Sequence, residues 1–455
     1  MGLIGRISPI CPISLISPIG PICPICPISP ISPISPISPM KRILTIITFL
    51  HFYIFSSNVV AQTTYSNPVI NRSLPDPTVI KAKDGYFYLY ATEDTHNVPI
   101  YRSKDLVTWR YAGTAFTDAT RPMDMVPNGA IWAPDINYFD GHYVLYYSKS
   151  EWGKTWENGI GVAVSDRPNG SFKNAHKLFL SSEIGIENCI DPFFIEDDGK
   201  KYLFFGSFHD IYGVELSDDG LSLREGATPT KIAGGLIEAT MIVKHDGWYY
   251  LIGSAGSCCE GANSTYRLVM TRSRNLFGPY VDRNGRTAVG DNFSPLLNKS
   301  TAVYGPGHCS EFVEDDAGQT WVLYHGFQAD NIDAGRVTYL DRINWGTGGW
   351  PTIQGMRPST EAAAPLFGAE AGITDVNATS GDNYLVMPTQ TPGMYRIEGP
   401  EGESFSWQLL TAGGVALQQG FGRHTVIVDF GIATHGMYII RVSGKSGSHS
   451  EKVSF

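Results

Sequence analysis

The chain has 455 residues, enough for one large domain and a small second one. Its formal net charge is −10 at pH 7, and its basic residues are scattered. This distribution leaves no electrostatic footprint for nucleic acid and so excludes a nucleic-acid-binding function. Aromatic residues make up 12% of the chain and charged residues only 17%, which weakly favours a β-rich secreted protein that acts on sugars.

The first 61 residues divide into two segments. Residues 1–39 are nearly all Pro, Ile, Ser and Cys, and so frequent a proline prevents both helix and strand ladder. We interpret this segment as translated upstream sequence; a genuine Pro-rich anchor is the alternative. A basic start at Met40, an apolar core and small residues before Gln62 predict a secretory signal peptide over residues 40–61. No later apolar stretch is long enough to span a membrane.

Five similar units follow one another over residues 66–353. Each starts at a polar lead residue, continues into an apolar run, turns mostly at an acidic-glycine pair and returns through an aromatic run. Short β-prone runs with such turns indicate antiparallel meanders. A single meander cannot cover both of its faces, so five copies predict blades stacked in a ring, a five-bladed β-propeller. The lead residues are Asp76, Asp135, Asp191, Glu238 and His308.

The repeat pattern lapses after residue 353. An Ala-rich connector occupies residues 354–380, and β-prone runs separated by glycine turns resume over residues 381–455. These runs predict a small C-terminal β-sandwich. It contains no cluster of acids or histidines, so we assign no chemistry to it. The fold class expected for the chain is therefore all-β.

Three lead residues are carboxylates that the ring would bring to one axis: Asp76, Asp191 and Glu238. A single acid beside a proline more often caps a turn, but recurrence at equivalent places favours a catalytic role. Glycoside hydrolysis needs a protonated acid at the leaving oxygen and a carboxylate opposite it. A third carboxylate can raise the pKa of the acid by like-charge repulsion. This set of residues therefore predicts a glycoside hydrolase.

Other residues near the expected axis are candidates for binding. Trp132 could stack on a sugar ring or pack in the core, and Asp135 could contact substrate or bond backbone amides between blades. Arg336 could reach sugar hydroxyls or the carboxylates, with a plain surface position as the alternative. His308 follows a Gly-Pro-Gly approach and could hold a metal ion or substrate, or pack as an ordinary histidine.

Four cysteines remain after the signal peptide: Cys189, Cys258, Cys259 and Cys309. Adjacent cysteines can close only a strained ring, so a bond between Cys258 and Cys259 is not the default and stays open. Export from the cell would permit it. No cysteine spacing is typical of a zinc site.

Over about residues 66–353 the chain resembles the endo-α-1,5-L-arabinanases of glycoside hydrolase family 43. This resemblance implies a five-bladed propeller that cleaves its substrate with inversion. The substrate implied is a plant cell-wall polysaccharide, arabinan or a related pentose polymer. The motifs that carry the resemblance are Ser257–Tyr266, Trp132-Ala-Pro-Asp135, Ile190-Asp191-Pro192 and Gly305-Pro-Gly-His308.

The resemblance also implies a role for each site residue. Asp76 corresponds to the general base and Glu238 to the general acid, while Asp191 orients the acid and tunes its pKa. His308 corresponds to a histidine that holds a calcium-type ion on the axis. In this chain Glu238 is followed by Ala-Thr-Met where Gly-Pro-Tyr is usual, a departure that bears on fine specificity rather than on catalysis.

Rival functions remain within and outside the family. An exo-acting α-L-arabinofuranosidase or a β-xylosidase is the alternative enzyme, and an inactive sugar-binding propeller is the alternative without chemistry. Five-bladed fructan-cleaving enzymes are set aside because no Arg-Asp-Pro or Glu-Cys pair is present. The C-terminal tail, with Gly436–Val442, resembles the sorting domain of the type IX secretion system. That resemblance implies export by this machinery and a place outside the cell or on its outer surface.

Overall fold

The computed structural model describes residues 63–346, 348–367, 383–389, 391, 393–411, 416–431 and 437–454. The Pro-rich segment 1–39, the expected signal peptide 40–61 and much of the connector lie outside these residues. In the described part of the chain the structure is almost entirely β-strand, with one short α-helix, α1 (Ser181–Ile184). No helix in this part is long and apolar enough to cross a membrane.

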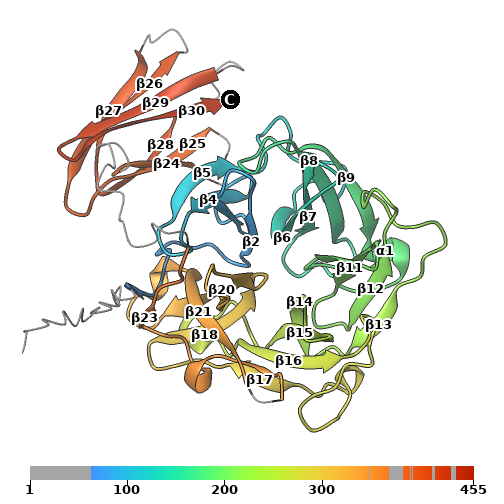
Figure 1. Cartoon of the computed structure of the whole chain (residues 1–455). Helices are drawn as coiled ribbons and strands as arrows, with labels where there is room; N and C mark the ends of the chain where they lie inside the picture. The colour runs from blue at the N-terminus through green and yellow to red at the C-terminus, as the bar shows by residue number, and fades with distance from the viewer. Residues whose placement is uncertain are drawn as a thin grey trace, which may run out of the picture. The chain divides into compact units, whose positions relative to one another are not determined.

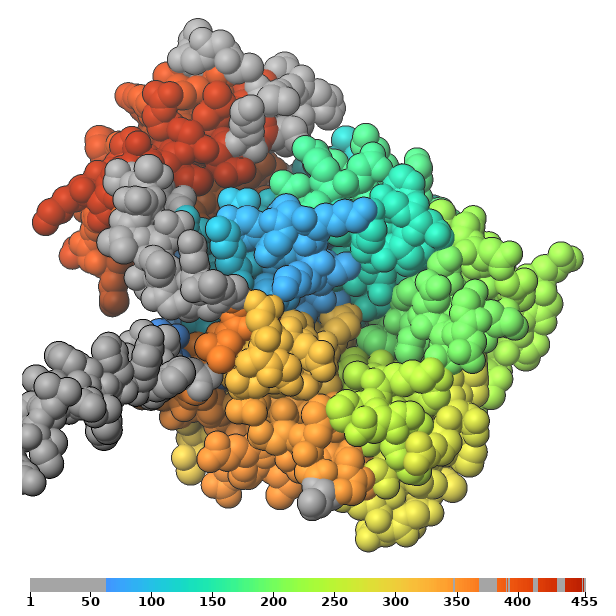
Figure 2. Space-filling view, viewed as in Figure 1, coloured from blue at the N-terminus to red at the C-terminus, as the bar shows by residue number. Residues whose placement is uncertain are grey.

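Five antiparallel sheets are arranged as blades around one axis (Figure 1). In the space-filling view the blades follow one another in chain order, from blue through green and yellow to orange (Figure 2). The five-bladed β-propeller predicted from the repeats is thus confirmed. The first two blades are β2 (Thr78–Lys81), β3 (Phe87–Tyr90), β4 (Pro99–Ser103), β5 (Arg110–Thr114), and β6 (Ala130–Phe139), β7 (His142–Ser150), β8 (Gly159–Ser165), β9 (Lys173–Leu180).

The other three blades repeat this plan, and the last one has an added short strand, β19 (Val313–Glu314), that also pairs with β20. Their strands are β10 (Phe193–Asp197), β11 (Lys200–Phe205), β12 (Ile211–Glu215), β13 (Thr230–Ala233); β14 (Ile237–His245), β15 (Trp248–Ala255), β16 (Arg267–Ser273), β17 (Ser294–Leu297); and β18 (Val303–Cys309), β20 (Thr320–Gln328), β21 (Val337–Trp345), β22 (Pro351–Thr352).

Asp-Gly pairs make the tight hairpins between first and second strands. At Asp140-Gly141, Asp198-Gly199 and Asp246-Gly247 both residues have positive φ, the geometry of the turn that matches strand twist. The second strands are buried on both faces, as in β3, where all four residues are buried. The sequences of these strands are largely apolar without alternation, because a neighbouring blade covers each face.

The hydrophobic core lies between the blades rather than inside any one of them. Tyr88 of the first blade and Leu145 of the second belong to one buried cluster, and Phe204 of the third blade joins the fourth and fifth in another. A further cluster joins Leu89 of the first blade to Trp321 of the fifth. Burial of these side chains therefore stabilises the closed ring, not the single blade.

Both ends of the propeller segment dock on the fifth blade and close the ring. Strand β1 (Thr64–Ser66) pairs with β23 (Glu361–Ala363). The Asn67 side-chain amide donates to the Leu340 carbonyl oxygen at 2.8 Å, and Ile70 bridges Thr338 of β21. The chain before the first blade and the chain after the fifth are thus held together.

The C-terminal strands form one seven-stranded sheet in the order β24-β25-β28-β27-β26-β29-β30. A single residue pair, Arg423–Thr425, joins β27 to β28, and the parts on either side share one core that includes Tyr384, Trp407 and Ile440. The predicted small sandwich is therefore one sheet curled on itself. Its strands are β24 (Leu385–Pro388), β25 (Met394–Glu398), β26 (Ser404–Thr411), β27 (Ala416–Arg423), β28 (Thr425–Asp429), β29 (Met437–Gly444) and β30 (Gly447–Ser454).

Candidate active site

One residue at the first strand of every blade adopts the left-handed backbone conformation. This conformation is costly for any residue except glycine, and runs of such outliers mark sites that the surrounding structure holds in place. The residues and their φ angles are Asp76 (57°), Ala133 (39°), Asp191 (57°), Ala239 (55°) and His308 (46°).

A ring of hydrogen bonds holds these five residues. In every case the left-handed residue donates its backbone N–H to a side chain of the preceding blade, which compensates for the unfavourable conformation. The bonds are Asp76 to His325 Nδ1 (3.0 Å), Ala133 to Thr92 Oγ1 (2.7 Å), Asp191 to Ser148 Oγ (2.8 Å), Ala239 to Asp191 Oδ2 (3.0 Å) and His308 to Ser254 Oγ (2.8 Å).

This register corrects two sequence interpretations. The sequence predicts Asp135 and Glu238 as the lead residues of the second and fourth blades, but Ala133 and Ala239 hold those places. In the second blade the physical signal is the following proline, since Pro134 comes after Ala133 as Pro192 comes after Asp191. Asp135 lies two residues further along β6, only 3% exposed, and accepts hydrogen bonds from the Phe194 N–H and the Asn137 side chain.

A cavity of about 660 Å³ opens where the left-handed residues meet. Asp76, Asp191 and Glu238 all line it, each from a different blade, and all three are buried or half-buried. The sequence therefore predicted a set that the fold does bring together. Trp132, His308 and Arg336 also line the cavity, whereas Asp135 does not.

Asp76 is held in its ionised form. Its Oδ1 lies 3.1 Å from His308 Nδ1 and 3.2 Å from an Arg336 guanidinium nitrogen, and its Oδ2 accepts a 2.6 Å hydrogen bond from Thr92. Burial alone would raise the pKa of Asp76, but the charges of Arg336 and His308 outweigh burial and hold this pKa well below its usual range. A carboxylate that stays charged can accept a proton from water.

The pKa of Glu238 is shifted in the opposite direction. Burial is the largest cause, and the charge of Asp76 adds to it, so the pKa of Glu238 is raised above its ordinary value. Two hydrogen bonds oppose this shift: Ser207 donates to Oε2 at 2.6 Å and Tyr266 donates to Oε1 at 2.7 Å. They also fix the direction in which the carboxyl group points, which suits a proton donor.

Asp191 interacts with the surroundings of both other carboxyl groups. Its Oδ2 accepts the N–H of Ala239, the residue next to Glu238. Burial raises the pKa of Asp191, and the charges of Glu238 and Asp76 raise it further, against the opposing effect of His308. Asp191 and Glu238 thus titrate as a pair that keeps a proton on this side of the cavity.

The histidines beside Asp76 differ in protonation. The pKa of His308 is raised: burial opposes its charge, but Asp76, Asp191 and Glu238 outweigh burial. His325 is fully buried, and burial lowers its pKa to about 4. The neutral His325 can therefore accept the Asp76 N–H on Nδ1, while His308, in its protonated form, places positive charge beside Asp76.

The prediction of a calcium ion on His308 finds no matching donor set. The described residues contain no group of three or more His, Cys, Asp or Glu side chains that could hold a metal ion, and His308 Nδ1 is directed at Asp76. Calcium prefers six to eight oxygen ligands. The ion stays a prediction, and no step below depends on it.

The second blade forms an aromatic wall. Trp132 contacts Trp152 edge-on, with ring centroids 6.2 Å apart, and both line the cavity. Trp152 is 76% exposed, although exposed tryptophan is uncommon without a function. These rings offer apolar faces on which a sugar can stack.

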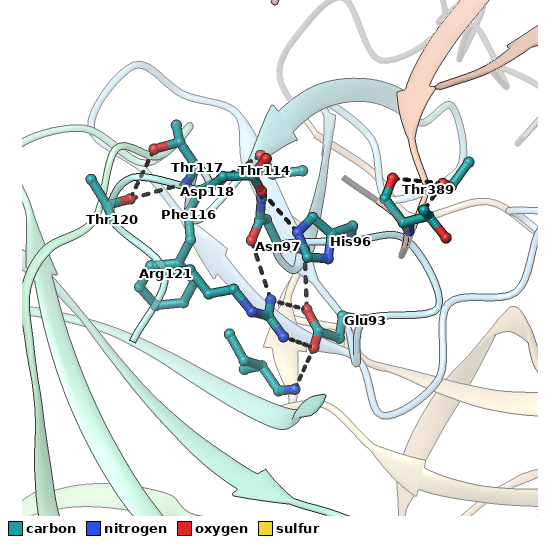
Figure 3. Close-up of polar contacts among 12 residues, drawn as sticks. Glu93, His96, Asn97, Thr114, Phe116, Thr117, Asp118, Thr120, Arg121 and Thr389 are labelled. Atoms are coloured by element: carbon teal, nitrogen blue, oxygen red, sulfur yellow. Dashed lines mark hydrogen bonds and ion pairs between the residues drawn. The ribbon is translucent and has the colours of Figure 1, made fainter. Parts of the chain in front are cut away.

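A buried ion pair fixes the base of this wall (Figure 3). Glu93 accepts hydrogen bonds from two Arg121 guanidinium nitrogens, at 2.5 and 2.6 Å, and from the Ile131 N–H at 2.6 Å. Ile131 directly precedes Trp132 in β6. Asn97 adds a 3.2 Å bond from Arg121 to its side-chain oxygen. The pair therefore positions the strand that carries Trp132.

Sequence reasoning missed the residues that tune the carboxyl groups. Thr92 and His325 contact Asp76, and Ser207 and Tyr266 contact Glu238, but the sequence analysis gives none of them a role. It also gives none to Glu93, which holds the Ile131 N–H. A signal was present for two of these residues, because Thr92 and His325, like Ser148 and Ser254, are polar residues at equivalent places near the ends of buried second strands. A polar residue in an apolar run needs a partner.

Carboxyl groups with opposite pKa shifts, meeting on the axis of a five-bladed propeller, define a glycoside hydrolase. Residues 65–351 match the model for glycosyl hydrolases family 43. The chain belongs to this family.

The similarity to known proteins extends over the propeller part of the chain. An extracellular exo-α-(1→5)-L-arabinofuranosidase of Cellvibrio japonicus is 32% identical over 306 residues, 61% of this chain and 85% of that protein. An extracellular endo-α-(1→5)-L-arabinanase of Bacillus subtilis is 30% identical over 311 residues, 66% and 93% of the two chains. The solved α-L-arabinanase of Cellvibrio cellulosa with arabinohexaose has a TM-score of 0.57 at 30% identity, covering 62% and 96%.

Proposed function

We propose that this protein hydrolyses α-1,5-linked L-arabinan by an inverting acid/base mechanism and acts within the polymer. The feature that carries the proposal is the arrangement of Asp76 and Glu238 in one cavity, with the pKa of Asp76 lowered by Arg336 and His308 and the pKa of Glu238 raised by burial. The similarity to proteins named as arabinanases supports the substrate class.

In the proposed reaction Asp76 removes a proton from a water molecule as that water attacks the anomeric carbon. Glu238 donates its proton to the glycosidic oxygen, so the bond from the anomeric carbon to that oxygen breaks and the shortened chain leaves as an alcohol. One displacement inverts the anomeric centre. Arg336 and His308 keep Asp76 ionised before the attack, and Asp191 orients the acid through its hydrogen bond from the Ala239 N–H.

Two measurements on linear arabinan test the proposal. Product sizing should show a ladder of oligosaccharides early in the reaction, and NMR of the first product should show the inverted anomer. A retained anomer would overturn the inverting mechanism. Absence of any product from arabinan, with a folded protein, would overturn the substrate.

Exo action is the second candidate. It is supported by the Cellvibrio japonicus relative, which is named as an exo-acting arabinofuranosidase and is as similar as the endo-acting one. An exo enzyme would release one short product from the start without a ladder. The same sizing experiment therefore separates the two modes.

We also propose that the protein works outside the cell. Two relatives are named extracellular, and the sequence predicts a signal peptide over residues 40–61. The resemblance of the C-terminal tail to a type IX sorting domain extends this proposal to export by that machinery. Deletion of residues 381–455 in the producing cell should then leave the enzyme in the cell fraction rather than in the medium or on the outer surface.

A further inference from the structure

The loop between β15 and β16 carries a disulfide between adjacent residues. Cys258 and Cys259 are bonded to each other, Cys259 is exposed and Cys258 half-buried. Both line the catalytic cavity together with Glu238. The other two cysteines of the described chain, Cys189 and Cys309, are buried and free. The disulfide that faces the cavity is not used by the acid/base chemistry.

The base of this loop is fixed without the disulfide. The N–H groups of Thr265 and Tyr266 donate to the Ser257 carbonyl oxygen, and the Ser257 N–H donates to Thr265 Oγ1 at 3.0 Å. Gly307 lets the fifth blade approach, since a Cβ there would lie 2.2 Å from the Tyr266 ring. Tyr266 is thus held by its own backbone bonds and packing, and the disulfide constrains only the loop tip.

The tip presents a surface that suits a sugar ring. The two sulfur atoms and the two CH2 groups form one apolar, polarisable edge of a small ring that is closed through the peptide bond. It therefore covers the C–H face of a sugar without competing for its hydroxyl groups. Glu260, next in the chain and also lining the cavity, adds an exposed carboxylate that can accept hydroxyl hydrogen bonds. Trp152 supplies apolar surface elsewhere in the same cavity.

We propose that the Cys258–Cys259 disulfide is a binding platform for a sugar unit on the leaving-group side of the cleaved bond. The side follows from the loop itself, which ends at Tyr266, the donor to Glu238 Oε1, and Glu238 protonates the leaving oxygen. Opening the disulfide removes the ring and leaves two thiol side chains that rotate independently. The proposal takes its sugar, an L-arabinofuranosyl unit, from the proposed function.

The experiment compares three forms of the full chain: oxidised wild type, wild type reduced with a phosphine, and the double variant Cys258→Ala/Cys259→Ala. Substrates are linear arabino-oligosaccharides of increasing length and an aryl arabinofuranoside, which has no sugar on the leaving-group side. Reduction should raise KM for oligosaccharides about three- to tenfold, the scale of one apolar contact, with kcat unchanged. For the aryl substrate KM should be the same in all three forms. The double variant should have the KM of reduced wild type, and the reductant should not change it.

Three results would overturn the platform. One is equal KM for oligosaccharides in all three forms. Another is an equal fall in kcat on both substrates with a shifted alkaline limb of the pH profile, because the loop would then act only through Tyr266. The third is a thiol titration of the denatured, unreduced protein that finds no disulfide. Inactivity of the oxidised wild type on arabinan is a separate failure, of the proposed function, and the platform is then judged by the same comparison on linear xylo-oligosaccharides.

Discussion

At the scale of single residues, Asp76 and Glu238 show how one cavity can hold two carboxyl groups in different states. Both are buried, and burial raises the pKa of each. Asp76 has Arg336 and His308 within ion-pair distance, whereas the hydrogen bonds to Glu238 come from the neutral donors Ser207 and Tyr266, and His308 acts on it only from farther away. The nearby cations, rather than the depth of burial, therefore separate the proposed base from the proposed acid.

Removing the two groups should have different effects on an activated substrate. Asp76→Ala should lose kcat by about 10²- to 10⁴-fold on every substrate, because no other group activates the water. Glu238→Ala should lose as much on arabinan but far less on aryl arabinosides, whose leaving group needs no proton. Steady-state rates on both substrates measure this. Equal losses for the two variants on the aryl substrate would contradict the acid and base assignments.

Tyr266→Phe should shift the pH profile in a defined direction. Glu238 must be protonated to act, so kcat/KM falls as pH rises through its pKa. The Tyr266 hydroxyl favours the ionised form and lowers that pKa, so its removal should move the alkaline limb to higher pH. Ser207→Ala should move it the same way. Tyr280→Phe, which removes a buried hydroxyl bonded to the Leu276 carbonyl, is the control and should move nothing.

At the scale of elements, the first strand of each blade combines a kink with a hydrogen bond to the preceding blade. Because this kink and its hydrogen bond recur in all five blades, side chains from separate blades point toward the same cavity. The fourth blade differs, because its Ala239 N–H bonds the Asp191 carboxylate while Ser207 is free to bond Glu238. This arrangement links Asp191 to the backbone of Ala239, the residue that follows Glu238.

Ala239→Gly should stabilise the protein. Alanine at φ 55° bears a left-handed cost that glycine does not, so the variant should gain about 1 kcal/mol in the free energy of unfolding. Denaturant unfolding measures the change. Ala362→Gly in the extended strand β23 is the matched control and should lose about 0.5–1 kcal/mol. A loss of stability in Ala239→Gly would show that the left-handed kink is not strained.

At the scale of the whole molecule, all the residues that line the catalytic cavity belong to the propeller. The C-terminal sheet has a hydrophobic core of its own. Closure of the ring, in contrast, depends on residues just after the last blade, since β23 pairs with β1. The boundary between what catalysis needs and what it does not should therefore fall after β23.

Two truncations locate this boundary. A chain ending at residue 380 should keep the kcat/KM of the full protein, because it retains the cavity and β23. A chain ending at residue 353 lacks β23 and should melt several degrees lower, since the β1–β23 pair and its buried contacts are lost. Activity assays and thermal melts of both chains measure this. Loss of turnover in a folded chain ending at 380 would show that the C-terminal sheet helps to build the site.

The sequence alone determined the propeller and its three carboxylates, because these follow from local signals: turn pairs such as Asp198-Gly199, apolar second strands, and a repeated polar lead residue. Asp135 was misplaced because its acidic side chain was weighed above the following proline: Pro134 marks Ala133 as the lead residue, and two residues further along β6 the Asp135 side chain links two blades.

Tertiary structure decided the charge of each group and the bond between Cys258 and Cys259. Asp76 meets Arg336 across 260 positions of sequence, and no local pattern reports such a contact. A pKa depends on the charges and the burial that surround a group in space, so the assignment of acid and base required the closed ring.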